Sequence, residues 1–314
     1  MYTLDTPIAF LVFNRPDTTR QVFAAIQSAR PSRLLIVADG PRHDHSSDAR
    51  LCNEVREIVN NVTWPCQVDI NFATENMGCR ERVISGLNWV FSLVEEAIIL
   101  EDDCLPHPCF FRYCSELLFR FRDDARIGMI SGTNFVEHFI SQPYSYYFSQ
   151  MFHIWGWATW RRAWAQYDPS LKDWPAIKAD KVLSEVIDDA RLIKYLSDIF
   201  DQMHNGSGPN TWDYQWLYSN LVNHSLSVVP RNNLITNIGF GPGATHTTDT
   251  KSAQVLPSRE IQFPLRHPPS LVSMRTLDCI DMRTSFLPTW KQRVFYRLSL
   301  PVRYLLELML PSRS

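Results

Sequence analysis

The sequence of 314 residues contains no run of about 18 apolar residues, the length that a membrane-spanning helix needs. Its first residues, MYTLDTPIAFLVFNRP, lack the basic stretch and long apolar run of a secretory signal peptide. The formal net charge of −2 leaves no basic excess for a nucleic-acid partner. None of the seven cysteines forms a CxxC pair, so we expect free thiols in a reducing compartment. These absences predict a cytoplasmic protein without a nucleic-acid partner.

The common phosphate-binding motifs are also missing. Neither GxxxxGK(S/T) nor GxGxxG occurs, so the usual NTPase and dinucleotide sites are not supported. The composition is nevertheless that of a folded chain, with 45% hydrophobic and 20% charged residues. Aromatic residues make up 12%, and such side chains pack in cores but also offer flat surfaces to sugars and bases.

Short apolar runs alternate with longer amphipathic segments in the first part of the chain. They predict strands at residues 8–13, 34–38, 68–72, 97–100 and 127–130, and helices at 17–28, 46–60, 78–94 and 107–121. Such alternation is typical of βαβ units. We therefore predict an α/β, Rossmann-like fold with a mostly parallel central sheet flanked by helices.

The pattern changes after about residue 132, where Gly, Trp and Tyr become dense. We expect one large domain over residues 1–250, with halves at 1–132 and 133–250. Residues 251–314 are richer in Pro and are expected to form a C-terminal helical extension. Within it, residues 290–310 mix basic and large apolar side chains. This segment is either an amphipathic helix in peripheral contact with an anionic membrane or a helix docked on its own domain.

Three predicted strands end in residues that carry chemistry. Asn14-Arg15 follows the first strand, Asp39-Gly40 follows the second, and Glu101-Asp102-Asp103 follows the fourth within AIILEDDCLP. Ligands of open parallel sheets bind outside the carboxyl ends of the strands. We therefore expect the three strand ends to face one crevice.

Three adjacent carboxylates repel one another, and burying them without a partner is costly. A hard divalent cation, Mn²⁺ or Mg²⁺, would remove that cost, because such ions prefer oxygen ligands. These ions also keep positions open for phosphate oxygens, which indicates a nucleotide diphosphate as co-ligand. The alternative is a solvated acidic turn that caps the next helix.

Six segments carry a resemblance to a known family through their order along the chain. They are LVFNRPDTTR (11–20), LLIVADG (34–40), AIILEDDCLPHPCFFRY (97–113), IWGWATW (154–160), TWDYQW (211–216) and VPRNNLITNIGFGPGATH (229–246). This layout resembles the GT-A fold, nucleotide-sugar-dependent glycosyltransferases, most closely the N-acetylglucosaminyltransferase I family. The likeness covers about residues 5–250. One departure is Tyr214, which stands where the family has a second Asp.

The resemblance implies roles for the residues at the strand ends. Asp103 would be the metal ligand, with Glu101 and Asp102 near the ribose and the sugar of the donor. Arg15 and Asp39 would contact uridine, and the alternatives for them are a surface Arg and a turn Asp.

The later segments supply a candidate base and its surroundings. Asp213 would take a proton from the acceptor hydroxyl as it attacks C1, and its alternative role is a helix cap. Trp212 and Trp216 share a helix face and would shield that base from water. Trp155 and Trp157 would pack either on a sugar or in the core.

Three basic residues complete the predicted site. Arg80 and Arg82 open a helix, whose N-terminus attracts phosphate, although an exposed helix face would explain them equally well. His246 follows a Gly-rich stretch and would touch the diphosphate or the metal, unless it is structural.

The sequence therefore predicts a metal-dependent, inverting glycosyltransferase that uses a UDP-sugar donor and a hydroxyl of a glycan or lipid-linked acceptor. Residues 1–132 would bind the nucleotide and residues 133–250 the acceptor. Two alternatives stay open: a sugar-nucleotide nucleotidyltransferase, and a non-catalytic glycan-binding protein on the same fold. The loop FNRPDTT, in place of a Gly-rich basic loop, speaks against the first. The retained carboxylates speak against the second.

Overall fold

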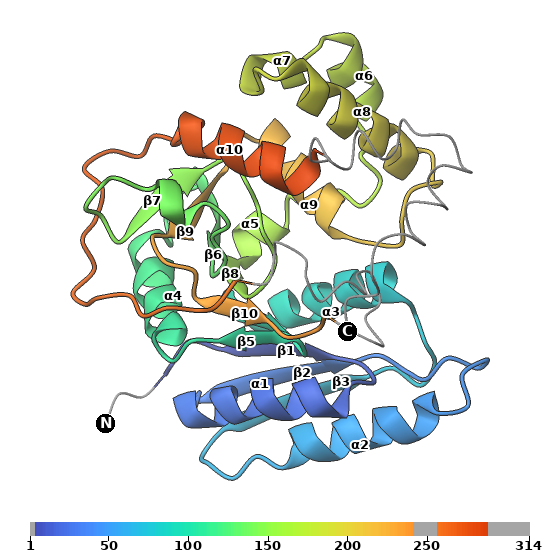
Figure 1. Ribbon diagram of the computed structural model, residues 1–314. Coiled ribbons are helices and arrows are strands. Elements are labelled where there is room, and N and C mark those ends of the chain that lie inside the picture. The colour runs from blue at the N-terminus through green and yellow to red at the C-terminus, as the bar shows by residue number, and fades with distance from the viewer. Residues whose placement is uncertain (1–3, 241–255, 288–314) are drawn as a thin grey trace, which may run out of the picture.

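The computed structural model describes residues 4–240 and 256–287, and the statements below concern those residues. The chain forms one α/β domain around an eight-stranded sheet of order β3-β2-β1-β4-β8-β6-β9-β7 (Figure 1). The first half contains β1 (Ile8–Val12), α1 (Pro16–Ala29), β2 (Arg33–Ala38), α2 (Asp48–Asn60), β3 (Gln67–Phe72), α3 (Cys79–Leu93), β4 (Glu96–Glu101), β5 (Cys104–Pro106), α4 (Cys109–Arg120) and β6 (Ile127–Ser131). The second half contains the 3-10 turn η1 (Glu137–Phe139), β7 (Tyr146–Ser149), β8 (Trp157–Trp160), α5 (Arg161–Trp164), α6 (Trp174–Ala179), α7 (Leu183–Val186), α8 (Ala190–His204), α9 (Asp213–Val222), β9 (Leu226–Pro230), β10 (Ile235–Asn237) and α10 (Arg275–Phe286).

Most strands of the large sheet point the same way. β2 and β4 flank β1 in parallel, and β3 continues in parallel beyond β2. β8 runs antiparallel between β4 and β6, which restores the first direction in β6 and β9. β7 closes the sheet antiparallel to β9. The predicted fold class, a mostly parallel sheet flanked by helices, is confirmed.

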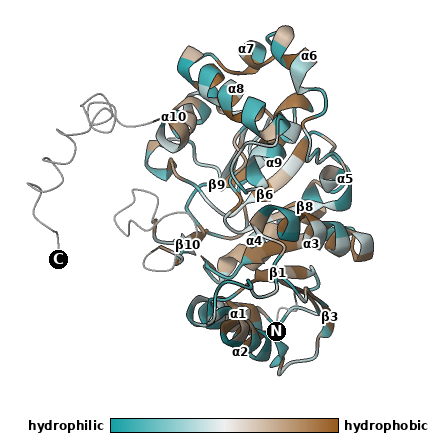
Figure 2. Ribbon diagram, turned by 90° about the vertical axis from the view of Figure 1, so that its right-hand side faces the viewer, coloured by the Kyte–Doolittle hydropathy of each residue, from teal (hydrophilic) through white to brown (hydrophobic). Residues whose placement is uncertain are grey.

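Both faces of the sheet are buried, which explains the unbroken apolar run of β1. Ile8 and Phe10 pack with residues of α1, α2 and α4, whereas Ala9 and Leu11 pack with residues of α3, α8 and α9. Figure 2 shows hydrophobic residues along β1 and a mixture of both kinds along the helices. A strand covered on both faces needs an apolar residue at every position.

The elements predicted up to β6 are confirmed to within two residues at each end. The short strands after it, and β5 before it, were not predicted. β5 forms only because β10, from the far end of the domain, pairs with it antiparallel. The hydrophobic periodicity of the local sequence cannot indicate a partner strand so distant in the chain.

The described part of the C-terminal extension returns to the domain. α10 packs against β7 and α8, and the Met274 amide ahead of it donates to the Phe148 carbonyl at 2.8 Å. Within residues 4–240 and 256–287, every helix is too short or too polar to cross a membrane. The segment 290–310, for which either membrane contact or docking on the domain is expected, lies outside the described residues, and so does His246.

Candidate active site

The loop after β1 and the acidic triplet after β4 lie side by side, because the two strands pair in parallel. The Phe13 amide donates a hydrogen bond to Asp102 Oδ2 at 3.1 Å. Arg15 forms an ion pair with Asp103, and its Nη1 lies 2.8 Å from Oδ2 of that carboxylate. Two of the three predicted strand ends therefore meet in direct contacts.

The three carboxylates of the triplet are crowded. Burial, followed by repulsion from Asp103 and Asp102, raises the pKa of Glu101 to about 8. Burial and the Asp103 charge raise the pKa of Asp102 to about 7. Glu101 Oε1 is shielded from solvent and has no hydrogen-bond partner. A cation beside the triplet would satisfy this oxygen and relieve the repulsion, so these residues fit a hard divalent ion.

The triplet does not form a complete protein cage for such an ion. Across the described ranges, no group of three or more His, Cys, Asp and Glu side chains is arranged to hold a metal. An ion at Asp103 would therefore take its remaining ligands from water or from a bound phosphate group. Mg²⁺ is usually bound in this way, through one or two carboxylates plus substrate phosphates.

A segment that is distant in sequence covers Asp103. Just after β10, the Ile238 amide donates to the main-chain oxygen of Asp103 at 2.8 Å. A methyl group on the next residue, Gly239, would lie only 2.2 Å from Asp103 Oδ2. Glycine is thus required here by a close approach, which the Gly-rich sequence pattern alone does not reveal.

Asp39 organises the turn that leads into α3. Its Oδ1 accepts hydrogen bonds from the amides of Gly40 at 2.8 Å and Met77 at 2.9 Å. Its Oδ2 accepts one from the Asn76 side chain at 2.9 Å. Burial raises the pKa of Asp39, although these amides act in the opposite direction. Asp39 supports the loop in this structure, and its contact with uridine stays a prediction.

The two arginines at the start of α3 have partners within the chain. Arg82 is buried and donates to the main-chain and side-chain oxygens of Asn71 near the end of β3. Arg80 pairs with Glu81, its neighbour in sequence, at 3.2 Å. These contacts are made within the chain itself, and the phosphate role of both arginines stays a prediction.

Asp213 is the first residue of α9 and lines a cavity of about 150 Å³. Its Oδ1 accepts a hydrogen bond from the Thr211 hydroxyl. The Asp213 carboxylate repels Glu101 and contributes to its raised pKa. Burial raises the pKa of Cys79 to about 12, with smaller contributions from Glu101, Asp213 and Asp39. The candidate base and the acidic triplet are therefore neighbours, although they are far apart in the sequence.

The tryptophans of the second half divide into core and cavity residues. The ring centroid of Trp157 lies 5.6 Å from those of Trp212 and Trp216, and these three side chains are at most 2% exposed. Trp155 is half-buried and lines the same cavity as Asp213. A direct sugar contact remains expected of Trp155. Trp157 and Trp212 instead support the wall that carries Asp213, because their rings face other rings rather than the cavity.

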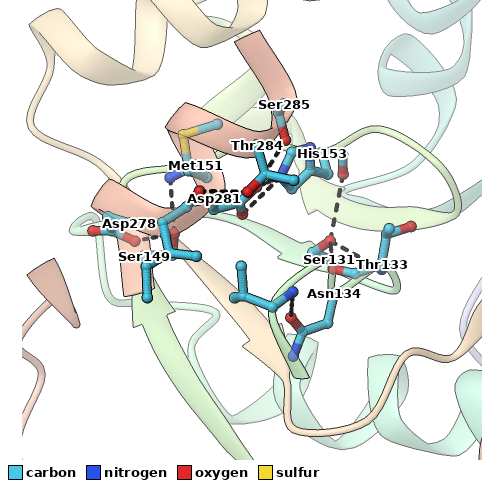
Figure 3. A network of polar contacts seen from close by, with 12 residues as sticks. Ser131, Thr133, Asn134, Ser149, Met151, His153, Asp278, Asp281, Thr284 and Ser285 are labelled. Atoms are coloured by element: carbon cyan, nitrogen blue, oxygen red, sulfur yellow. Dashed lines mark hydrogen bonds and ion pairs between the residues drawn. The ribbon is translucent and has the colours of Figure 1, made fainter. Parts of the chain in front are cut away.

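Two contacts at the cavity could not be predicted from the sequence. His153 lines the cavity, and its Nε2 lies 2.8 Å from Asp281 Oδ2 on α10 (Figure 3). Tyr214 also lines it, in the position of the family's second Asp, and its hydroxyl is 2.9 Å from that of Tyr195. Both contacts arise from tertiary packing between distant segments, which residue spacing cannot predict.

Comparisons with known proteins give similarities only to solved structures, and those described below are weak. No family model matches the chain, and no curated protein matches it in sequence. One similar solved structure, a UDP-glucose pyrophosphorylase complexed with UDP-glucose, is 11% identical with a TM-score of 0.24. The match covers 46% of this chain and 62% of that chain, so this chain spans about three fifths of its length.

Two other solved structures are similar over more of their length. An apo UDP-glucose pyrophosphorylase is 9% identical with a TM-score of 0.36, over 74% of this chain and 93% of that chain. A CMP:2-keto-3-deoxy-manno-octonic acid synthetase complexed with CTP is 13% identical with a TM-score of 0.30, over 58% and 87%. Similarities of this strength do not assign an activity to this chain.

Proposed function

We propose that this protein is a metal-dependent, inverting glycosyltransferase. It transfers a sugar from a UDP-sugar donor to a hydroxyl of a glycan or lipid-linked acceptor. The observation that carries the proposal is the proximity of two acidic groups with different surroundings. The Glu101-Asp102-Asp103 triplet is crowded at a strand end beside Gly239, and Asp213 lines a cavity whose Trp155 contacts Phe240, the residue after Gly239. The Asp213 charge also contributes to the raised pKa of Glu101.

The triplet is the donor side of the proposed site. Asp103 would hold Mn²⁺ or Mg²⁺, and Glu101 and Asp102 would face the ribose and the sugar. When bound, the ion would offset the charge of the diphosphate as UDP leaves. The unpartnered Glu101 Oε1 supports the presence of positive charge at this point. Arg15, already paired with Asp103, supplies a second positive group.

Asp213 is the acceptor side of the proposed site. Inversion in a single displacement needs one carboxylate to take the proton from the attacking hydroxyl. Asp213 has the required access, since it lines the cavity, and the buried tryptophans behind it exclude water from one side of α9. The Thr211 hydroxyl donates to its Oδ1, which fixes the orientation of the carboxylate.

The main alternative is a sugar-nucleotide nucleotidyltransferase, and the names of the similar structures agree with it better than with sugar transfer. Two features of this chain favour transfer instead. α1 begins at Pro16, so the loop after β1 is too short for a Gly-rich triphosphate cradle. Its side chains are also engaged, because Asn14 donates to Asp48 at 2.8 Å and Arg15 pairs with Asp103.

One assay separates these activities. The protein is incubated with UDP-sugars, Mn²⁺ and a mixture of glycan acceptors, and the release of UDP and of pyrophosphate is measured in parallel samples. A second set contains UTP and sugar 1-phosphates. Transfer predicts release of UDP that depends on acceptor and metal. Release of pyrophosphate from UTP would instead show that the protein is a nucleotidyltransferase.

Two variants test the assigned roles. Asp213→Asn should lower transfer by a factor of about 10² to 10⁴, the usual contribution of a general base, and leave UDP binding intact. Asp103→Ala should abolish the dependence of UDP binding on Mn²⁺. If both variants keep full transfer activity, the proposed mechanism is wrong. Stabilisation by glycans but never by UDP would indicate the glycan-binding alternative.

A further inference from the structure

Besides α9, which carries Asp213, three segments that are distant in sequence bound the cavity. Phe135 comes from the loop after β6, His153 and Trp155 from the loop between β7 and β8, and Phe286 from the last turn of α10. Its volume of about 150 Å³ is below the range of about 300–1,000 Å³ of pockets for drug-sized ligands. The enclosed part of the cavity therefore suits a single ring.

The cavity wall combines aromatic faces with a few polar groups. The Phe135 ring meets the His153 ring edge-on at 4.6 Å and the Trp155 ring at 5.4 Å between centroids. Asp213, His153 and Ser285 add a carboxylate, an imidazole and a hydroxyl to this wall. A pyranose has an apolar face for aromatic rings and hydroxyls at its edge for carboxylate, imidazole and hydroxyl groups. This wall suits such an uncharged ring, whereas the Asp213 carboxylate disfavours a charged diphosphate.

The cavity adjoins the acidic triplet through aromatic contacts. Trp155 meets Phe240 with ring centroids 5.7 Å apart. Phe240 directly follows Gly239, the residue whose Cα lies against Asp103. A ring in the cavity would thus lie next to the donor side without occupying it.

Helix α10 completes the wall and is fastened to it by polar contacts. Both carboxylate oxygens of Asp281 lie within 3.0 Å of His153 Nε2, and the Ser285 hydroxyl donates to Asp281 Oδ1 at 2.9 Å. One turn earlier, Asp278 accepts a hydrogen bond from the Ser149 hydroxyl at 2.5 Å. Figure 3 shows these side chains of α10 directed at the segment from Ser149 to His153. The position of Phe286 is therefore fixed by the fold.

We propose that this cavity is the acceptor subsite and that it binds one pyranose ring of a glycan acceptor between Phe135, Trp155 and Phe286. The C-terminal helix α10 thereby selects the acceptor, with Asp281 as a positioning residue that acts through His153. That the bound ring belongs to the acceptor rests on the proposed function. The binding of a pyranose in this cavity does not depend on that function.

Saturation-transfer NMR with the full chain tests this subsite. The probes are the methyl β-glycosides of glucose, galactose and N-acetylglucosamine, each titrated with UDP and Mn²⁺ present. At least one glycoside should bind. Phe286→Ala should weaken its affinity about fivefold or more, the scale of one lost aromatic contact. The matched control is Phe139→Ala, because Phe139 is 61% exposed and does not line the cavity. This variant should bind the glycoside with the same affinity as the wild type.

Asp281→Asn provides a second variant and a readout that separates positioning from folding. It should weaken glycoside binding while UDP binding in Mn²⁺ stays within twofold of the wild type. The subsite is overturned if no glycoside binds to the wild type, or if Phe286→Ala and Asp281→Asn bind glycosides as tightly as the wild type. If glycoside binding is lost in both variants but no UDP-sugar is ever consumed, the subsite stands and the proposed transfer reaction fails.

Discussion

Gly239→Ala is the smallest change that should disturb the proposed metal site. The added methyl group would lie 2.2 Å from Asp103 Oδ2 and 2.8 Å from its Cβ and Cγ, whereas ordinary contacts begin near 3.4 Å. Either Asp103 or the segment after β10 must therefore move by about 1.2 Å. If Asp103 moves, its ion pair with Arg15, now 2.8 Å long, cannot keep its geometry.

Isothermal titration calorimetry of UDP, with and without Mn²⁺, measures the consequence. The variant should bind UDP in Mn²⁺ about tenfold or more weakly than the wild type, the effect of one lost charge-assisted contact. A shift of about 1 Å also predicts a loss of about 10² in the transfer rate. Without Mn²⁺, the two proteins should bind UDP alike.

Gly206→Ala is the matched control. Gly206 has a φ of +71°, so alanine there should cost about 1 kcal/mol of stability, but no atom lies within 4 Å of the added methyl group. It should lower the melting temperature without changing UDP affinity. If Gly239→Ala binds UDP in Mn²⁺ within twofold of the wild type, Asp103 does not hold the ion in the way proposed.

Three further predictions concern stability, and urea unfolding measures each. Burial raises the pKa of Asp278 to about 6, so the native state binds an extra proton between about pH 4 and 6, and stability is lost as the pH rises through that window. Asp278→Asn should remove this fall of about 3 kcal/mol, and an unchanged pH profile would contradict the assignment. The hydrogen bond from Arg42 lowers the pKa of buried Asp48 to about 2, so its contribution is present above about pH 4 and lost as the pH falls through 2. Asp48→Asn should therefore cost about 2 kcal/mol at pH 7 and nothing near pH 2. Trp157→Ala should cost about 3–5 kcal/mol because it empties a fully buried site, and a loss below 1 kcal/mol would show that the ring is not part of the core.

The proposed donor side of the site could be predicted from the sequence because its residues lie at strand ends. β1 and β4 are buried on both faces, so their apolar runs stand out, and the residues that follow them must lie at one edge of a parallel sheet. Arg15 and the Glu101-Asp102-Asp103 triplet were located by this rule alone. Their contacts follow from the parallel pairing of neighbouring strands.

The proposed acceptor side could not be predicted in the same way. Its residues are joined by contacts between segments more than a hundred residues apart, such as His153 with Asp281 and Ser149 with Asp278. The pairing of β5 with β10, which brings Gly239 onto Asp103, is likewise non-local. Neither hydrophobic periodicity nor motif spacing records such contacts. The same limit applies to Trp157, since a core tryptophan and a sugar platform look alike in sequence.

The dependence of UDP binding on a divalent ion tests the central claim most directly. Thermal unfolding is followed with UDP alone, with Mn²⁺ alone and with both, for the wild type and for Asp103→Ala. The account predicts that UDP raises the melting temperature of the wild type only when Mn²⁺ is present, and that Asp103→Ala shows no such rise. Equal stabilisation by UDP in the presence of EDTA, or no stabilisation by UDP and Mn²⁺ together, would contradict it.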